Sequence, residues 1–161
     1  RDIASEVAAL GQPYGYRLRL RERRRATAED RDRLALPRGV SILHLVAVHR
    51  AGEEPFCIED RIISLAAVPA AASESFADRA PGPWLLEQVP WSAAEHVVRA
   101  LGAGGREAEL LAVPPGFPCL VIERRTSAGG DPVTAVTLTY RGDRQALTAS
   151  FTPAQAGSAA G

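Results

Sequence analysis

The chain has 161 residues, with 19 basic and 19 acidic side chains and three histidines, so its formal charge is zero. A chain of this size and charge forms one domain and has no overall field that would attract nucleic acid or an anionic membrane. No apolar run reaches the length of a membrane-spanning helix. Cys57 and Cys119, without a signal peptide, indicate a reducing compartment, and we expect a cytoplasmic protein in which both are core residues.

The first predicted element is a short helix at Asp2–Leu10, with Asp2 as the N-cap and Gly11 as the stop. A strand follows at Tyr16–Arg21, where apolar and arginine side chains alternate strictly, giving one buried and one wet face. The arginine run that continues to Arg25 allows phosphate contact, as in nucleic-acid binding, or a solvated strand edge. Because no aromatic platform or neighbouring basic motif accompanies it, we favour the solvated edge.

The central feature is a segment that the chain contains twice, at an offset of 77 residues. Each copy has a short helix, a Pro–x–Gly turn, and two apolar strands joined by a Gly-bearing loop. Two such hairpins side by side would form most of one antiparallel sheet. The predicted helices are Thr27–Leu34 and Arg106–Leu111, and the predicted strands are Val40–Val48, Pro55–Ile63, Leu120–Thr126 and Val133–Tyr140.

The other segments complete the prediction. Ser64–Ala80 reads as a loop with a short helix, a second helix begins near Trp84, and Glu95–Ala103 alternates like a strand. A last strand is predicted at Gln145–Phe151, followed by a disordered tail at residues 152–161. The predicted fold class is α+β: an antiparallel or mixed sheet of about six strands, with short helices on its faces or ends.

Glu59 and Arg61 are the sharpest candidates for a binding site. Two positions apart on a strand, they project from the same face, about 7 Å from one another. Cys57 and Ile63 flank them, so this face is at least partly covered. A carboxylate and a guanidinium placed in this way can hold opposite ends of a polar ligand. Alternatively, they neutralise each other or cross-strand partners on a solvent-exposed face.

The hairpin register decides which histidine joins this pair. An odd-length loop after Arg50 places His49 on the face of Glu59, whereas an even-length loop places His44 there. The sequence leaves both registers open. It contains no cluster with metal-ligand spacing, nucleophile motif, phosphate loop or dinucleotide fingerprint. We therefore predict a protein that is not an enzyme and that uses neither a metal nor a cofactor.

Several short motifs occur in a characteristic order between Asp2 and Phe151. They are Asp2-Ile3 with Leu10-Gly11, Leu36-Pro37-Arg38-Gly39, Gly52 with Pro55 and Glu59, and Tyr140-Arg141-Gly142-Asp143-Arg144. Together they resemble the UTRA effector-binding domain of GntR-family transcription regulators of the HutC subfamily. The resemblance implies a chorismate-lyase-like fold over residues 1–151 and a homodimer. It also implies that operator DNA is bound only through an N-terminal winged helix-turn-helix domain that is absent from this fragment.

Within that family, Ile58-Glu59-Asp60-Arg61 and Glu95-His96-Val97-Val98 are most similar to histidine-utilisation repressors, whose effector is urocanate. Two segments depart from that branch. Ile62-Ile63-Ser64 stands where Tyr-Val-Asn is usual, and Gly82-Pro83-Trp84 stands where an Asn normally precedes a Tyr. In spite of these two departures, the resemblance implies a small carboxylate effector, with urocanate as the first candidate.

The strand pattern indicates Glu59 and Arg61 as ligand-binding residues. The family resemblance implies that His49, Trp84, Thr134 and Tyr140 also line the site. Trp84 and Tyr140 could equally be core aromatics. The alternative function is a chorismate-lyase-type enzyme acting on a small dicarboxylate, in which Arg61 would clamp the substrate and Glu59 would move protons. The complete expected set is His49, Glu59, Arg61, Trp84, Thr134 and Tyr140.

Overall fold

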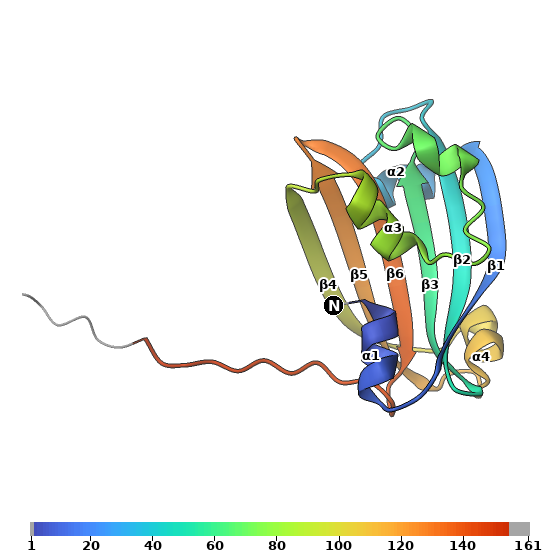
Figure 1. Ribbon diagram of the computed structural model, residues 1–161, viewed down its shortest axis with the longest axis vertical. Helices are drawn as coiled ribbons and strands as arrows, with labels where there is room; N and C mark the ends of the chain where they lie inside the picture. Colours follow the sequence, from blue (N-terminus) through green and yellow to red (C-terminus); the bar gives the residue numbers. More distant parts are fainter. Residues whose placement is uncertain (1, 155–161) are drawn as a thin grey trace, which may run out of the picture.

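A six-stranded antiparallel sheet forms the centre of the computed structural model, which describes residues 2–154 (Figure 1). The strand order is β1-β2-β3-β6-β5-β4, so β1 and β4 are the two edge strands. The strands are β1 (Tyr14–Arg25), β2 (Ser41–Ala51), β3 (Glu54–Ser64), β4 (Ala93–Gly102), β5 (Pro118–Ala128) and β6 (Asp131–Arg141). The helices are α1 (Ile3–Ala9), α2 (Ala28–Leu34), the 3-10 helix η1 (Pro69–Ser73), α3 (Pro81–Gln88) and α4 (Gly105–Leu111). The predicted α+β class is confirmed.

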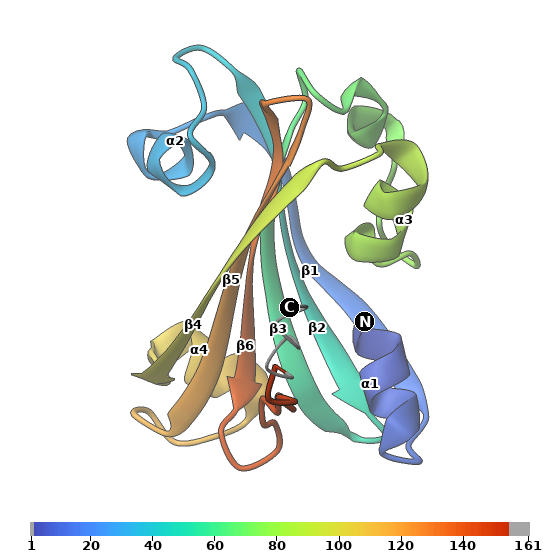
Figure 2. The ribbon, with the colours of Figure 1, turned by 90° about the vertical axis from the view of Figure 1, so that its left-hand side faces the viewer.

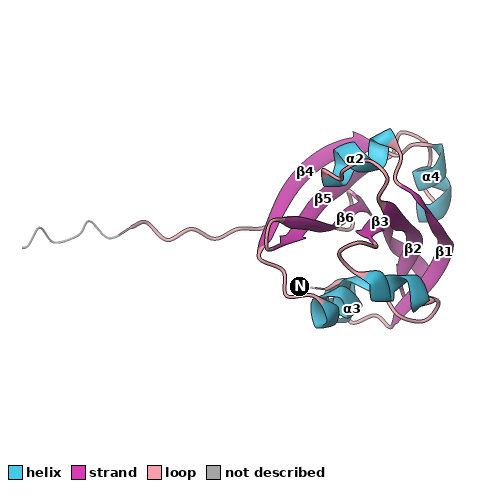
Figure 3. Ribbon diagram, turned by 90° about the horizontal axis from the view of Figure 1, so that it is seen from above, coloured by secondary structure: helices cyan, strands magenta, loops and turns pink. Residues whose placement is uncertain are grey.

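Helices cover both faces of the sheet (Figures 2 and 3). One face carries α1, η1 and α3, and we call it the α3 face; the other carries α2 and α4, and we call it the α2 face. Glu59, Arg61 and Thr134 lie on the α3 face, whereas His44 and Asp60 lie on the α2 face. Successive strand residues point to opposite faces, so two neighbouring residues of β3 serve two different surroundings.

The predicted repeat is confirmed as two helix–turn–hairpin units, α2–β2–β3 and α4–β5–β6. Both helices end at an alanine in the left-handed conformation, Ala35 with φ 52° and Ala112 with φ 56°, which differ by the same 77 positions. The two units meet where β3 pairs with β6, and Asp60 lies opposite Thr137, again 77 positions away. The two units are therefore related by an approximate two-fold axis through this pair.

Local sequence signals account for the helix starts. Asp2 caps α1 by accepting a hydrogen bond from the Ser5 amide at 2.7 Å, as predicted. Thr27 and Asp30 form a reciprocal capping box at the start of α2, in which Asp takes the role usual for Glu or Gln. Arg24 at the end of β1 forms an ion pair with the same aspartate, so the cap also anchors α2 to the sheet.

Four clusters of buried apolar side chains hold the helices against the sheet. The cluster under η1 and α3 includes Leu43, Leu45, Ile63, Phe76 and Trp84. Both cysteines are buried and free, as expected for core residues. No helix within residues 2–154 is long and apolar enough to cross a membrane.

The predicted strand Tyr16–Arg21 lies within β1, but its predicted alternation is wrong, and a second strand prediction is wrong altogether. The strict alternation at Tyr16–Arg21 is broken by a register shift between Leu18 and Leu20, so Leu20 turns away from the buried side and is 39% exposed. The predicted last strand, Gln145–Phe151, has extended backbone but pairs with no strand among the described residues. Alternation of apolar and polar residues indicates a strand only when a sheet edge is available to receive it. Of the predicted disordered tail, residues 155–161 lie outside the described residues.

Candidate functional site

A β-bulge in the first hairpin settles which histidine lies beside Glu59. Its turn has two residues, Gly52 and Glu53, which alone would pair His49 with Phe56. The ladder skips Phe56, however, and pairs His49 with Cys57. The bulge therefore has the effect of an odd-length loop and places His49 on the α3 face.

The α3 face carries a chain of hydrogen-bonded side chains, which we call the buried polar chain. The Tyr14 hydroxyl lies 2.6 Å from Nδ1 of His49, and Nε2 of His49 lies 2.7 Å from Oε1 of Glu59. Nε of Arg61 donates to Oε2 of Glu59 at 2.7 Å, and its Nη1 donates to Oγ1 of Thr134 at 3.1 Å. Four strands, β1, β2, β3 and β6, each contribute to this chain.

Glu59 is the charged centre of the buried polar chain, with 2% of its surface exposed. Burial alone would raise the pKa of its carboxyl group, but the charge of Arg61 and the hydrogen bond from His49 lower it to about 2. Glu59 is therefore ionised and can only accept hydrogen bonds, so Nε2 of His49 donates. Burial and the nearby charge of Glu59 also raise the pKa of Tyr14.

Aromatic side chains and the start of α3 cover the buried polar chain. The Tyr16 ring lies 5.4 Å from that of His49, and its hydroxyl donates to the carbonyl oxygen of Phe76 at 2.7 Å. Phe76 in turn makes an edge contact with Trp84 of α3, with ring centroids 5.1 Å apart. A Cβ atom at Gly82 would lie 3.6 Å from Nη2 of Arg61. The first turn of α3 thus lies directly against this guanidinium.

Nη2 of Arg61 has no hydrogen-bond partner among the described residues, although Nε and Nη1 are both engaged. The side chain is 8% exposed. A guanidinium nitrogen in such a position can donate to an anion that enters beside α3. The α3 face therefore offers a charged donor, whereas the rest of the buried polar chain satisfies itself.

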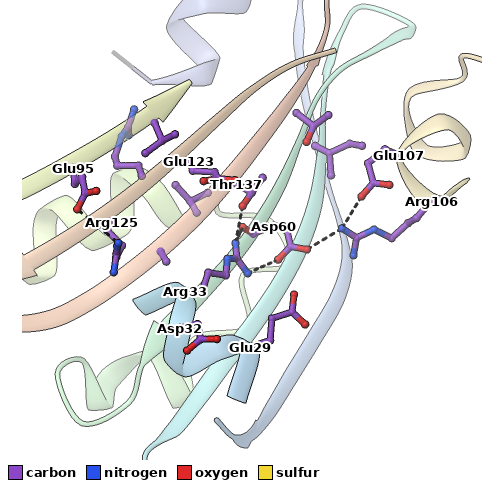
Figure 4. Close-up of a pocket in the computed structure, with 16 residues that line it drawn as sticks. Glu29, Asp32, Arg33, Asp60, Glu95, Arg106, Glu107, Glu123, Arg125 and Thr137 are labelled. Carbon is purple, nitrogen blue, oxygen red and sulfur yellow. Dashed lines mark hydrogen bonds and ion pairs between the residues drawn. The ribbon is translucent and has the colours of Figure 1, made fainter. Parts of the chain in front are cut away.

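A second polar site occupies the α2 face, centred on Asp60 (Figure 4). It is a groove of about 500 Å³ between α2, α4 and the strands. Asp60 accepts hydrogen bonds from Arg33 of α2 at 3.1 Å, from His44 at 2.9 Å and from Arg106 of α4 at 2.9 Å. Burial raises the pKa of Asp60, but these three partners together hold it well below its usual range.

The groove on the α2 face is best explained as structural. Asp60 joins both helices to the centre of the sheet, and Arg33 also donates to Thr137 on the neighbouring strand at 3.1 Å. Other charges at the rim are paired and half exposed, as for Arg125 with Glu95. Two of its carboxylates, Glu29 and Asp32, form no ion pair among the described residues, but both are exposed to water and need no ligand to neutralise them. The α3 face, where the guanidinium of Arg61 is buried, is therefore the stronger candidate.

Comparison with known proteins agrees with this fold. A family model described as the UTRA domain matches residues 9–146. The chain belongs to the UTRA domain family. Over 150 residues it is 34% identical to a histidine utilization repressor from Pseudomonas putida, with 93% of this chain and 60% of the relative covered. This UTRA domain therefore spans about 60% of the length of the curated relatives it matches.

Solved structures give the same assignment. The C-terminal domain of histidine utilization repressor from Pseudomonas syringae pv. tomato str. DC3000 is 32% identical with a TM-score of 0.80, covering 86% of this chain and 99% of that one. The effector domain of PhnF from Mycobacterium smegmatis has a TM-score of 0.81 over 94% of each chain. At 18% identity, that second likeness concerns the fold alone.

The UTRA domain brings four of the six predicted site residues into one hydrogen-bonded group: His49, Glu59, Arg61 and Thr134. Trp84 lies in the core cluster under α3 and is connected to the group only indirectly, through Phe76 and then Tyr16. Tyr140 lies outside the group and donates to Oε2 of Glu6 on α1 at 3.1 Å. The ligand contacts of all six remain a prediction.

Sequence reasoning missed two members of the site, Tyr14 and Tyr16. Tyr14 precedes the predicted strand, which starts at Tyr16, but β1 begins at Tyr14 and its hydroxyl reaches His49. The sequence predicts Tyr16 only as a residue on the buried face of its strand. Because Tyr16 pairs with His49, its ring is one of the aromatic groups that cover the buried polar chain. Only the pairing of β1 with β2 could have revealed either role. The described residues contain no group of acidic, histidine or cysteine side chains that could hold a metal ion.

Proposed function

We propose that this chain is the effector-sensing, dimerising domain of a HutC-type transcription repressor. It binds a small carboxylate metabolite, with urocanate as the first candidate, and thereby changes the DNA affinity of a winged helix-turn-helix domain N-terminal to it. A ligand acts in this way only if it binds two conformations of the protein unequally. The names of the relatives at 32–34% identity support the regulatory role.

The unengaged Nη2 of Arg61 carries the effector proposal. The guanidinium of Arg61 is a buried positive charge, and its only ionic partner within residues 2–154, Glu59, is shared with His49. A carboxylate that enters beside Gly82 would complete the hydrogen bonds of this guanidinium. The oxygens of Glu59 have remaining lone pairs that can accept from a nitrogen at the far end of the ligand. A planar acid with an N–H at its other end, such as urocanate, matches both requirements.

The lyase alternative is weaker. Proton transfer at neutral pH requires a carboxyl group whose pKa lies near 7. Arg61 and His49 lower the pKa of Glu59 to about 2 in spite of its burial. At neutral pH this carboxylate is therefore a weak base and carries no proton to donate. The arrangement is suited to holding a ligand rather than to chemistry on it.

Calorimetry and thermal unfolding of this chain test the effector proposal. Urocanate at a hundred times its dissociation constant should add about 2.7 kcal/mol of stability, or roughly 5–10 °C for a domain of this size. Methyl urocanate, which has the same ring and no carboxylate, is the matched control and should add little. If neither urocanate nor any other small carboxylate stabilises the folded chain, the effector proposal is wrong.

Exposed apolar side chains support the homodimer. Nine large hydrophobic residues are exposed among those described, and six of them lie in only two segments. Four lie in α3, in β4 or in the connection between them, and two belong to the extended segment that follows β6. These six are Leu86, Trp91, Val98, Leu101, Leu147 and Phe151. Val98 and Leu101 lie on β4, which is an edge strand, so these residues support an interaction surface along that edge.

The extended segment at residues 145–154, which we call the arm, leaves the body on the β4 side of the sheet (Figures 1 and 3). Leu147 and Phe151 alternate with polar residues, as in a half-buried strand, yet they are 57% and 90% exposed. The free edge of β4 is poor in charge, whereas the other edge, β1, carries many arginines that discourage pairing. We infer that the arm of each copy pairs with β4 of a second copy.

Sedimentation equilibrium tests this interface. The chain should be a dimer, and a variant that ends at Arg144, which keeps the ion pair of Arg144 with Glu54, should be a monomer. Leu101→Asp should also dissociate the dimer, whereas Leu10→Asp should not, although the two leucines are 51% and 54% exposed. A monomeric parent chain at tens of micromolar would refute the homodimer, and a dimeric truncated variant would refute the exchange of arms.

A further inference from the structure

A row of side chains crosses the α3 face at the level of Arg61. Arg61 of β3 lies opposite Val136 of β6, and Val136 lies opposite Arg124 of β5. Arg124 in turn lies opposite His96 of β4. Residues paired in this way across an antiparallel sheet share one face, and neighbouring strands are about 4.8 Å apart. Arg61 and Arg124 therefore stand about 10 Å apart at their backbones, with one small apolar side chain between them.

Arg124 lacks the partner that its neighbours have. On the opposite face of the same pair of strands, β4 and β5, Arg125 forms an ion pair with Glu95, and Arg99 forms one with Glu123. Arg124 has no carboxylate within ion-pair distance among the described residues, and its Nε donates to Nε2 of His96 at 3.0 Å. Arg124 is half-buried, so water can solvate its positive charge only in part and does not fully substitute for a bound anion.

The charges around Arg124 agree with the geometry. Burial, followed by the positive charge of Arg61, lowers the pKa of Arg124, which is an unusual direction for an arginine. The start of α3 adds to the same positive region, because a Cβ atom at Gly82 would lie 3.6 Å from Nη2 of Arg61 and the N-cap residue Ala80 makes no side-chain capping bond. Two guanidiniums and the positive end of a helix thus face one space on the α3 face.

We propose that Arg124 is a second anion-binding residue of this site and that the effector carboxylate lies between the guanidiniums of Arg61 and Arg124. This inference rests on the proposed function and names a residue that the predicted site lacks. Exposure increases along the row, from the buried Arg61 through the half-buried Arg124 to the exposed His96. An anion can therefore approach from β4 and pass Arg124 before it reaches Arg61. His96 accepts from Arg124 and holds its guanidinium over the sheet.

Titration calorimetry with urocanate tests the role of Arg124. Arg124→Leu should weaken binding at least tenfold, whereas Arg125→Leu, the adjacent arginine on the opposite face, should bind within twofold of the parent chain. Arg124→Lys keeps the positive charge but loses the planar guanidinium, which can donate two parallel hydrogen bonds to a carboxylate, and it should give an intermediate affinity. Thermal unfolding of each variant without ligand verifies that all of them are folded.

The outcomes separate the two proposals. If the parent chain binds urocanate and Arg124→Leu binds it equally well, Arg124 has no role in binding and the proposed function stands. If the parent chain binds neither urocanate nor malonate, offered as a generic carboxylate, the anion site itself does not exist and both proposals fail. If Arg125→Leu weakens binding as much as Arg124→Leu, the effect is one of overall charge, and the specific role of Arg124 is refuted.

Discussion

Replacing Glu59 by glutamine tests whether the buried polar chain depends on one negative charge. The amide keeps the shape of the side chain and can still accept one hydrogen bond, but it leaves the guanidinium of Arg61 without an anion. The pKa of the Glu59 carboxyl falls from 4.5 to about 2 on folding, because the charge of Arg61 and the bond from His49 outweigh burial. At about 1.4 kcal/mol per pH unit, the ionised carboxylate contributes roughly 3 kcal/mol to stability at neutral pH.

The contribution of Glu59 to the free energy of unfolding depends on pH, and the lowered pKa fixes the direction of that dependence. Because the pKa of Glu59 is lower in the folded chain, its contribution is present above pH 4.5 and is lost as the pH falls from 4.5 towards 2. Glu59→Gln should therefore be about 3 kcal/mol less stable than the parent chain at pH 7, and the difference should nearly vanish near pH 2. Asp60 also destabilises the fold in acid, but it does so equally in both proteins, so the difference isolates Glu59.

Urea denaturation followed by the fluorescence of Trp84, which is buried, measures these free energies. Glu95→Gln is the matched control, because its ion pair with Arg125 is exposed and should contribute less than about 1 kcal/mol. A double-mutant cycle with Arg61→Gln should show a coupling of about 2–3 kcal/mol. A pH-independent difference between Glu59→Gln and the parent would show that the carboxylate is not paired as described.

Two further substitutions test other parts of the fold. Asp60→Asn removes the charge that joins α2 and α4 to the sheet and should cost about 3 kcal/mol, measured by urea denaturation. Gly142→Ala should lower stability by about 1–3 kcal/mol, because its Cβ would lie 2.7 Å from a carbonyl oxygen at the start of β5. Gly105→Ala, whose Cβ would meet nothing within 4 Å, should be neutral in the same urea-denaturation assay.

Much of the fold could be predicted because the repeat encodes it twice. Each unit has its own helix stop, Pro–x–Gly turn and apolar hairpin, so errors in one copy are corrected by the other. The bulge was not visible in this way, although it too is repeated: the ladders skip Phe56 in one hairpin and Val133 in the other, 77 positions apart. A bulge depends on how two strands pair, and no single residue in the sequence indicates where it occurs.

The candidate site could be predicted only in part, for a related reason. Glu59 and Arg61 share a strand, so period two alone places them together. Tyr14 and Arg124 reach the same face from other strands, and their proximity depends on the strand order and on four separate registers. The strand order places β3 and β6 at the centre, where neither the chain order nor composition indicates which distant strands are neighbours.

The position of Gly82 beside Arg61 offers a test of the anion site that does not depend on the effector. Gly82 has space for a side chain, because a Cβ there would lie at an ordinary contact distance of 3.6 Å from Nη2 of Arg61. Gly82→Asp would place a carboxylate beside that nitrogen, in the position proposed for the carboxylate of the ligand. It also adds a negative charge to the first turn of α3, where the helix dipole favours it.

We therefore expect Gly82→Asp to stabilise the ligand-free chain by about 1–2 kcal/mol and to weaken urocanate binding more than tenfold, since the internal carboxylate competes for the same guanidinium. Gly82→Ala separates the loss of glycine flexibility from the charge, and Gly82→Asn separates size from charge. Both controls should bind urocanate within about threefold of the parent chain. If Gly82→Asn weakens binding as strongly as Gly82→Asp, the pocket beside α3 is limited by space and the carboxylate does not bind at Arg61.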